Sequence, residues 1–87
     1  MRGDRSAAVP RFYFHLLNDV DVPDEEGREL PDLEAARQFA AQSLRFTTAE
    51  SLKEQGRIVL KHRIQIEDAE GNVLHTVRVS DVVQVEA

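Results

Sequence analysis

Apolar residues follow three different periods along the chain, and each period predicts a different kind of element. They stand almost side by side in residues 11–17, recur every three or four positions in 33–55, and alternate with polar residues in 57–68. Alternation is typical of a strand with one buried face, and a period of three to four is typical of an amphipathic helix. The pattern therefore predicts a strand, then a helix, then a second strand region.

The first strand, "RFYFHLL" at residues 11–17, carries apolar or aromatic side chains on both faces. Such a composition favours a central strand or one covered on both sides. Asn18-Asp19 favours a turn, because both side chains can bond to the nearby backbone. Val20 and Val22 then predict a short returning strand, which Pro23 would end.

The helix is predicted from Leu33 to Gln55, with Asp32 as its N-cap and Gly56 just after its last turn. Its apolar stripe is expected to consist of Leu33, Ala36, Ala40, Leu44 and Thr47, widened by Phe39 and Phe46. The β-branched pair Thr47-Thr48 predicts a kink or an early end.

Two strands joined by a hairpin are predicted for the last third of the chain. The alternation in 57–68 places on one face Ile58, Leu60, Ile64 and Ile66, interrupted by His62. "DAEGN" at 68–72 has the glycine and asparagine that a tight hairpin loop needs, and 73–79 is the partner strand. A last turn near Ser80-Asp81 would bring Val82, Val83 and Val85 back to the core.

These elements predict a single α+β domain over residues 10–87, preceded by a disordered tail at residues 1–9. One long helix would pack on a small three- or four-stranded, mostly antiparallel sheet, in the order β-β-α-β-β. A chain of 87 residues fits one domain with a thin core.

The composition excludes several classes of protein. The chain has no cysteine, which excludes disulfides and thiolate metal sites. No apolar run approaches the roughly 18 residues that a membrane helix needs, so no membrane partner is expected. The first ten residues lack the apolar stretch of a secretory signal, and we therefore expect a cytosolic protein.

Residues 18–32, "NDVDVPDEEGRELPD", hold seven acidic residues and one base, a local charge of −6. The whole chain has a formal net charge of −5, so this segment accounts for all of the negative excess. A calcium loop of the EF-hand type fails there, because Asp24 stands where that loop needs its glycine. Instead, Gly27 is expected to turn the chain. The remaining surplus of acids predicts a docking surface for a basic protein partner, the acidic patch, formed by Asp24, Glu25, Glu26 and Glu29.

No catalytic residue, metal ligand or cofactor site is assigned from motifs. His15, His62 and His75 come from three different expected strands, and only their convergence would give a metal or acid–base site. The basic residues Lys53, Arg57, Lys61 and Arg63 would either touch nucleic-acid phosphates or pair with an acidic stretch, such as residues 18–32, of a second copy. With Tyr13 as a stacking ring, Lys61 and Arg63 are the candidate nucleic-acid contacts.

Three stretches together resemble a family of small bacterial proteins catalogued only as a domain of unknown function. They are "RFYFHL", "PDEEGRELPDLEAAR" and "IEDAEGNVLHTVRVSDVVQVE", and the resemblance spans about residues 10–86. Its most specific part consists of Asp24, Glu26, Gly27 and Leu30, followed by Pro31-Asp32-Leu33 and Ala35-Ala36. The resemblance implies a stand-alone cytosolic protein and no activity or binding residues.

The leading hypothesis from the sequence is a small non-enzymatic binding or adaptor protein that acts through protein–protein contacts. Exposed strand edges and a thin core favour a homodimer. One alternative is a nucleic-acid-binding module that uses a basic strand face. The other is a metal-binding protein or enzyme that uses the histidines and the acidic residues.

Overall fold

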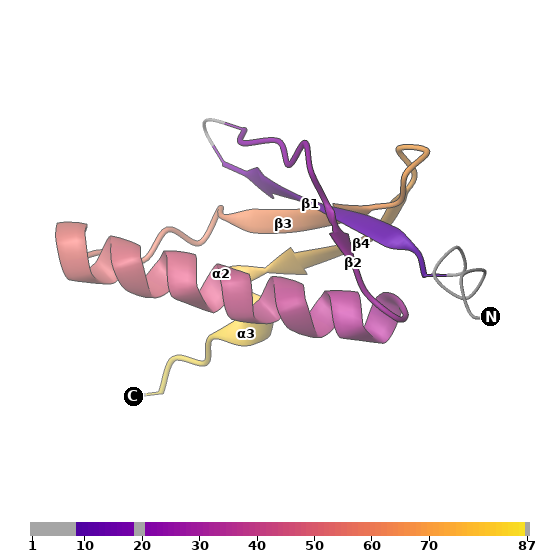
Figure 1. Cartoon of the computed structure of the whole chain (residues 1–87). Coiled ribbons are helices and arrows are strands. Elements are labelled where there is room, and N and C mark those ends of the chain that lie inside the picture. The colour runs from indigo at the N-terminus through magenta and orange to yellow at the C-terminus, as the bar shows by residue number, and fades with distance from the viewer. Residues whose placement is uncertain (1–8, 19–20, 87) are drawn as a thin grey trace.

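The structure, a computed structural model, describes residues 9–18 and 21–86. Its elements are β1 (Arg11–Leu17), β2 (Arg28–Glu29), α2 (Leu33–Gln55), β3 (Arg63–Glu67), β4 (Val73–Arg78) and α3 (Val79–Val82) (Figure 1). The predicted α+β fold is confirmed: one long helix packs on an antiparallel four-stranded sheet. The tail predicted for residues 1–9 lies, apart from Val9, outside the described residues.

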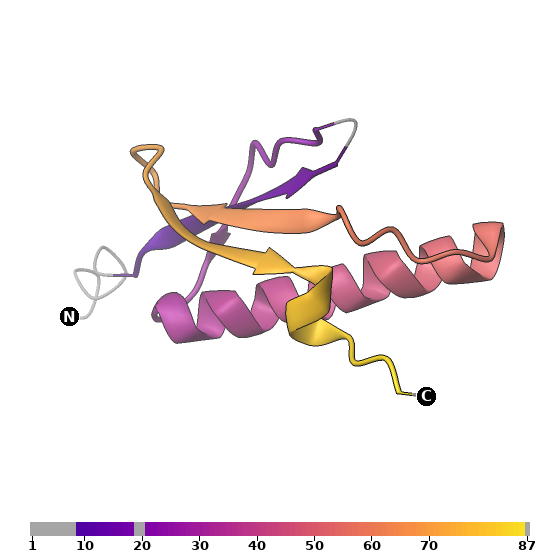
Figure 2. The ribbon, with the colours of Figure 1, turned by 180° about the vertical axis from the view of Figure 1, so that it is seen from behind.

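The sheet has the strand order β2-β1-β3-β4, and every pair is antiparallel. Across the three longer strands, Leu16 pairs with Ile64 and Ile64 with Val77, so these side chains share one face. Tyr13 pairs with Glu67, and this pair lies on the opposite face. Both helices lie on one side of the sheet, as the two opposite views show (Figures 1 and 2).

The core lies between α2 and the sheet. It consists of Phe12, Ala36, Ala40, Leu44, Ile64, Ile66, Val77 and Val79. Two of the helix residues in this core are alanines, whose short side chains let the backbone of α2 approach the sheet closely. The single covered face explains why the alternation in β3 is so regular.

Both ends of α2 are where the sequence placed them, because both caps are local. The Asp32 carboxylate accepts the N–H of Ala35 at 2.9 Å, and Gly56 adopts a left-handed φ of 70° while its N–H donates to the carbonyl of Leu52 at 2.9 Å. The early end predicted at Thr47-Thr48 is wrong, since the helix continues through both residues. Thr48 is buried, so packing against the sheet outweighs its weak helix propensity.

The buried row of α2 differs from the predicted stripe. It consists of Ala36, Ala40, Leu44 and Thr48. Leu33 is 37% exposed, and Phe46, predicted to widen the stripe, is 68% exposed. At 100° per residue, Phe46 points roughly 140° away from the middle of the buried row, which explains why that prediction is wrong. Phe39 is half-buried, with its ring edge against Phe14 at a centroid distance of 4.8 Å.

The second strand is not where the sequence placed it. Val22 makes a single antiparallel bridge with Leu16, through N–H···O contacts of 2.8 and 3.0 Å, and Val20 lies outside the described residues. The paired strand is instead β2, whose polar residues carry no alternating pattern that sequence reasoning would detect. β2 pairs with the start of β1, at Arg11 and Phe12.

The strand predicted for residues 57–62 is also wrong, since β3 begins only at Arg63. The reason is the length of its neighbours: β1 ends at Leu17 and β4 at Arg78, and both are paired with Arg63. A strand needs a partner strand for its backbone groups, and in the described chain no strand is paired with the residues before Arg63. These residues bond locally instead, and the N–H of His62 donates to the carbonyl of Val59 at 3.3 Å. Ile58 and Leu60 are accordingly 38% and 70% exposed.

The predicted last turn is the short helix α3, in which the Asp81 carboxylate accepts the N–H of Arg78 at 2.9 Å. Val82 and Val83 pack against the core as expected, but Val85 is 83% exposed, so its predicted return is wrong. Within the described part of the chain, no helix combines the length and the apolar character needed to cross a membrane.

Candidate functional site

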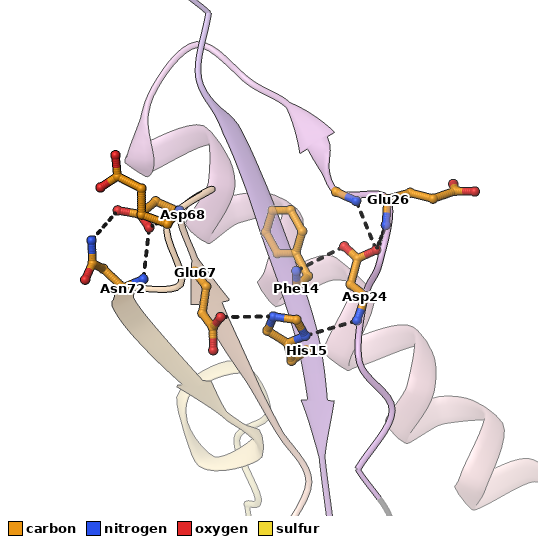
Figure 3. Close-up of polar contacts among 9 residues, drawn as sticks. Phe14, His15, Asp24, Glu26, Glu67, Asp68 and Asn72 are labelled. Atoms are coloured by element: carbon orange, nitrogen blue, oxygen red, sulfur yellow. Dashed lines mark hydrogen bonds and ion pairs between the residues drawn. The ribbon is translucent and has the colours of Figure 1, made fainter.

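Asp24 fastens residues 21–29, the rim segment, to strand β1. Its carboxylate accepts three backbone N–H groups, from Phe14 at 3.1 Å, Gly27 at 3.1 Å and Glu26 at 3.2 Å (Figure 3). Burial alone would raise the pKa of Asp24, but these hydrogen bonds lower it below its usual value. Asp24 is therefore a structural anchor, and its carboxylate is already satisfied within the chain.

His15 links the rim segment to strand β3. Its Nδ1 accepts the N–H of Asp24 at 3.0 Å, and its Nε2 lies 3.2 Å from the Glu67 carboxylate (Figure 3). Only a nitrogen without a proton can accept, so in this arrangement the proton is on Nε2, which donates to Glu67. Both ring nitrogens are thus occupied, and neither is left to act as a base or to ligate a metal.

Gly27 brings the rim segment into direct contact with β1. The residue has a φ of 71°, and a Cβ added there would lie 2.8 Å from Cε2 of Tyr13 and 2.9 Å from the carbonyl oxygen of Phe12. Only glycine combines this conformation with this approach. The turn that the sequence predicted at Gly27 is confirmed.

The acidic patch divides into engaged and free carboxylates. Asp24 is engaged as described, and Glu29 pairs with Arg11 at 3.2 Å. Glu25 and Glu26 are exposed, and their carboxylates have no hydrogen bond or ion pair within residues 9–18 and 21–86. Figure 3 shows the Glu26 side chain pointing away from β1. Of the four predicted contacts, these two carboxylates are therefore available to a partner.

A groove of about 320 Å³ lies between α2 and β1, beside the rim segment, and we call it the α2–β1 groove. Its apolar lining comes from Phe14, Leu16, Phe39 and Ile64, and its polar lining from Asp24, Glu26, Gly27, Arg28, Ser43 and Thr47. The Arg28 guanidinium lies 4.4 Å from the centre of the Phe39 ring, a cation–π contact. The result is an apolar floor whose lining also includes Glu26, a residue with an unpaired carboxylate, and the cation Arg28.

A second groove, of about 420 Å³, lies between α2, β4 and α3. Several of its polar groups already bond within the chain: the Glu34 carboxylate accepts from Arg37 and from Gln38, each at 3.3 Å, and that of Asp81 caps α3. His75 lines this groove as well. Because these groups satisfy one another, this groove has less capacity to bind a ligand than its size suggests.

The candidate nucleic-acid contacts do not form one surface. Tyr13 lies opposite Glu67, whereas Arg63 lies opposite Leu17, four residues along β1 and roughly 13 Å away. The Arg63 side chain donates to the carbonyl of Lys61 at 3.3 Å, so the two basic residues are neighbours. Lys61 and Arg63 therefore do not flank the Tyr13 ring, and nucleic-acid binding stays a prediction.

The three histidines lie apart. His15 is on the uncovered face of the sheet, whereas His75 pairs with Ile66 on the face that α2 covers. His62 precedes β3, and its Nδ1 is buried without a hydrogen-bond partner. In the described chain, no three His, Asp or Glu side chains are grouped so that they could hold a metal ion.

Sequence reasoning missed the α2–β1 groove, because its lining comes from segments far apart in the chain. The helix period assigned Phe39 to the apolar stripe, and strand parity placed Phe14 on one face of its strand. Neither signal shows that the two rings remain half-buried beside an acidic turn. That juxtaposition depends on how the rim segment crosses β1.

Comparison with known proteins agrees with the resemblance seen in the sequence. No curated protein and no solved structure matches the chain. A family profile described as a domain of unknown function, DUF6894, matches residues 11–80. The match runs from the first residue of β1 into α3 and covers most of the chain. The chain therefore belongs to the DUF6894 family, a domain of unknown function.

Proposed function

We propose that this protein is a small, non-enzymatic cytosolic binding module that docks a basic, partly apolar segment of a partner protein in the α2–β1 groove. The observation that carries the proposal is an apolar floor whose lining includes Glu26, a residue with an unpaired carboxylate, with the unpaired carboxylate of Glu25 next to it in the chain. A binding site of this kind needs apolar contact area and a few well-placed polar groups, and the groove offers both.

The two parts of the groove have different roles in binding. The half-buried rings of Phe14 and Phe39 offer apolar area, and burying it against a partner contributes about 25 cal/mol per Å² before the cost of association. The carboxylates at the rim remain in contact with water, so they contribute more to partner selection and association rate than to affinity. The expected complex is specific for charge and modest in strength.

The hydrogen bonding of His15 and Asp24 supports binding over acid–base chemistry. A general base needs a free nitrogen or carboxylate oxygen within reach of a substrate. Both nitrogens of His15 are occupied, and the Asp24 carboxylate accepts three N–H groups. These residues hold the rim segment in place, and that placement shapes the groove.

Two labelled peptides test the proposal, one of alternating Leu and Lys and one of alternating Leu and Glu. Fluorescence anisotropy should show binding of the basic peptide only, weakening as salt is raised from about 0.05 M to about 0.5 M because the charges are exposed. The Glu25→Gln/Glu26→Gln variant should bind about fivefold more weakly, whereas Glu70→Gln, an exposed acid on the hairpin, should bind like the wild type.

A filled groove gives a second, independent variant. Ser43→Phe places a ring in the groove and should abolish peptide binding, whereas Gln42→Phe places the same ring on the exposed side of α2 and should not. Equal binding of the two peptides, or unchanged binding by Ser43→Phe, would disprove the proposed site. Circular dichroism of each variant controls for loss of the fold.

A further inference from the structure

Residues 57–61, which we call the basic segment, have the chemistry that the α2–β1 groove is suited to bind. Ile58 and Leu60 are 38% and 70% exposed. Arg57 and Lys61 flank them and are exposed, and neither has a carboxylate partner within 4 Å in the part of the chain that the structure describes. The Arg57 side chain donates only to the side-chain oxygen of Gln55, at 3.2 Å. The basic segment therefore presents two apolar side chains between two cations that have no carboxylate partner.

The position of the basic segment explains its exposure. The last turns of α2 extend beyond the sheet, and the chain then returns from the end of the helix to β3 (Figures 1 and 2). The Ser51 hydroxyl donates to the carbonyl of Arg57 at 3.1 Å and fixes the start of this return to the helix. The alternation of β3 continues backwards through Leu60 and Ile58, but β1 and β4 both end opposite Arg63. The segment has a strand-like pattern without a covering partner.

We propose that the partner in the α2–β1 groove is a second copy of this chain, whose basic segment occupies the groove. This inference rests on the function proposed above and names its partner. Ile58 and Leu60 match the apolar floor, and Arg57 and Lys61 match the free carboxylates of Glu25 and Glu26. The cation in the groove lining, Arg28, lies over the Phe39 ring. Because the whole chain carries a net charge of −5, two copies repel at long range, and only a local match of opposite charges favours their contact.

Each copy carries one groove and one basic segment, and we propose that two copies exchange them reciprocally in a closed two-fold dimer rather than in an open chain. In such a dimer the same contact is made twice, which compensates for the small size of each groove. The basic segment in the second copy would also gain the covering surface that its own sheet does not provide. The wild-type mass by sedimentation equilibrium should therefore be twice that of one chain at ~100 µM, where a micromolar complex is saturated.

A charge exchange between two variants tests the pairing directly. The acid-reversed variant is Glu25→Lys/Glu26→Lys, and the base-reversed variant is Arg57→Glu/Lys61→Glu; all four positions are exposed. Each variant alone places like charges together and should have the mass of one chain. An equal mixture should restore the dimer, because each groove then meets a segment of opposite charge. Glu70→Lys/Glu86→Lys, with the same change in charge at other exposed sites, should remain a dimer.

Failure of this inference is distinguishable from failure of the proposed function. A wild-type mass of one chain, or a wild-type dimer that neither reversed variant disrupts or that the mixture does not restore, overturns the second copy as the partner. The base-reversed variant keeps its own groove intact and should bind the Leu–Lys peptide. If it binds the peptide while the wild type is a monomer, the proposed function stands with another partner; if it does not bind, the proposed function itself fails.

Discussion

Asp24 in the rim segment and Asp68 in the β3–β4 hairpin both use a carboxylate to accept backbone N–H groups (Figure 3). The donors to Asp68 all lie within four residues: the N–H of Glu70 and of Asn72, each at 2.9 Å, and the Asn72 side chain at 3.0 Å. One donor to Asp24 is Phe14, ten residues away in β1. The same chemistry closes a local turn in one place and joins two separate segments in the other.

Each turn also contains a glycine with a positive φ, 71° at Gly27 and 87° at Gly71. An added Cβ at Gly71 would meet nothing within 4 Å, whereas one at Gly27 would meet the backbone carbonyl of Phe12 and the ring of Tyr13, both in β1. The hairpin glycine therefore serves only its own backbone. The glycine of the rim segment serves a tertiary contact as well, and its neighbour Glu26 lines the α2–β1 groove.

Replacing the two glycines should give the largest difference between the turns. Gly27→Ala combines a left-handed φ with contacts of 2.8 and 2.9 Å, and we expect a loss of about 3 kcal/mol or more in the free energy of unfolding. Gly71→Ala carries the backbone strain alone, about 1 kcal/mol. Urea denaturation of both variants measures the difference, and equal losses would contradict the tertiary role of Gly27.

Replacing the two aspartates should give the next largest difference. Asp24→Ala leaves the partly buried N–H of Phe14 without its acceptor and should cost about 2 kcal/mol of unfolding free energy. Asp68→Ala exposes its donors to water, which replaces the lost acceptor, so its effect should be clearly smaller. Amide hydrogen exchange should accelerate at Phe14 only in Asp24→Ala; faster exchange at Phe14 in Asp68→Ala would show that the hairpin is not a local unit.

The contrast between local and tertiary contacts also explains how far the sequence could predict the fold. Asp32 and Gly56 cap α2 through bonds to residues close in the chain, and both were predicted correctly. The length of β3 depends on where β1 and β4 end, and residues 57–62 alone do not contain that information. Residues 57–62 continue the alternation of β3, but the neighbouring strands β1 and β4 both end opposite Arg63.

The candidate site followed the same rule. The sequence identified the acidic patch by composition, but it could not show which acids were free. The Asp24 carboxylate is engaged because the N–H of Phe14 lies beside it, and the Glu29 carboxylate because Arg11 does. The unpaired carboxylates of Glu25 and Glu26 emerge only after these contacts are assigned.

The dependence of stability on pH should show the same contrast at the smallest scale. The pKa of Asp24 lies below its usual 3.8, so the unfolded chain binds protons more readily and stability falls as pH drops through the lowered pKa. Hydrogen bonds from the Asn72 side chain and backbone also lower the pKa of Asp68, but its donors all lie within four residues on the hairpin, so it should contribute less. Urea midpoints measured from pH 6 down to about pH 2.5 should therefore fall less steeply in Asp24→Asn than in the wild type, and Asp68→Asn should follow the wild type more closely. Equal slopes in all three proteins would mean that Asp24 holds the rim segment no more tightly than Asp68 holds its hairpin.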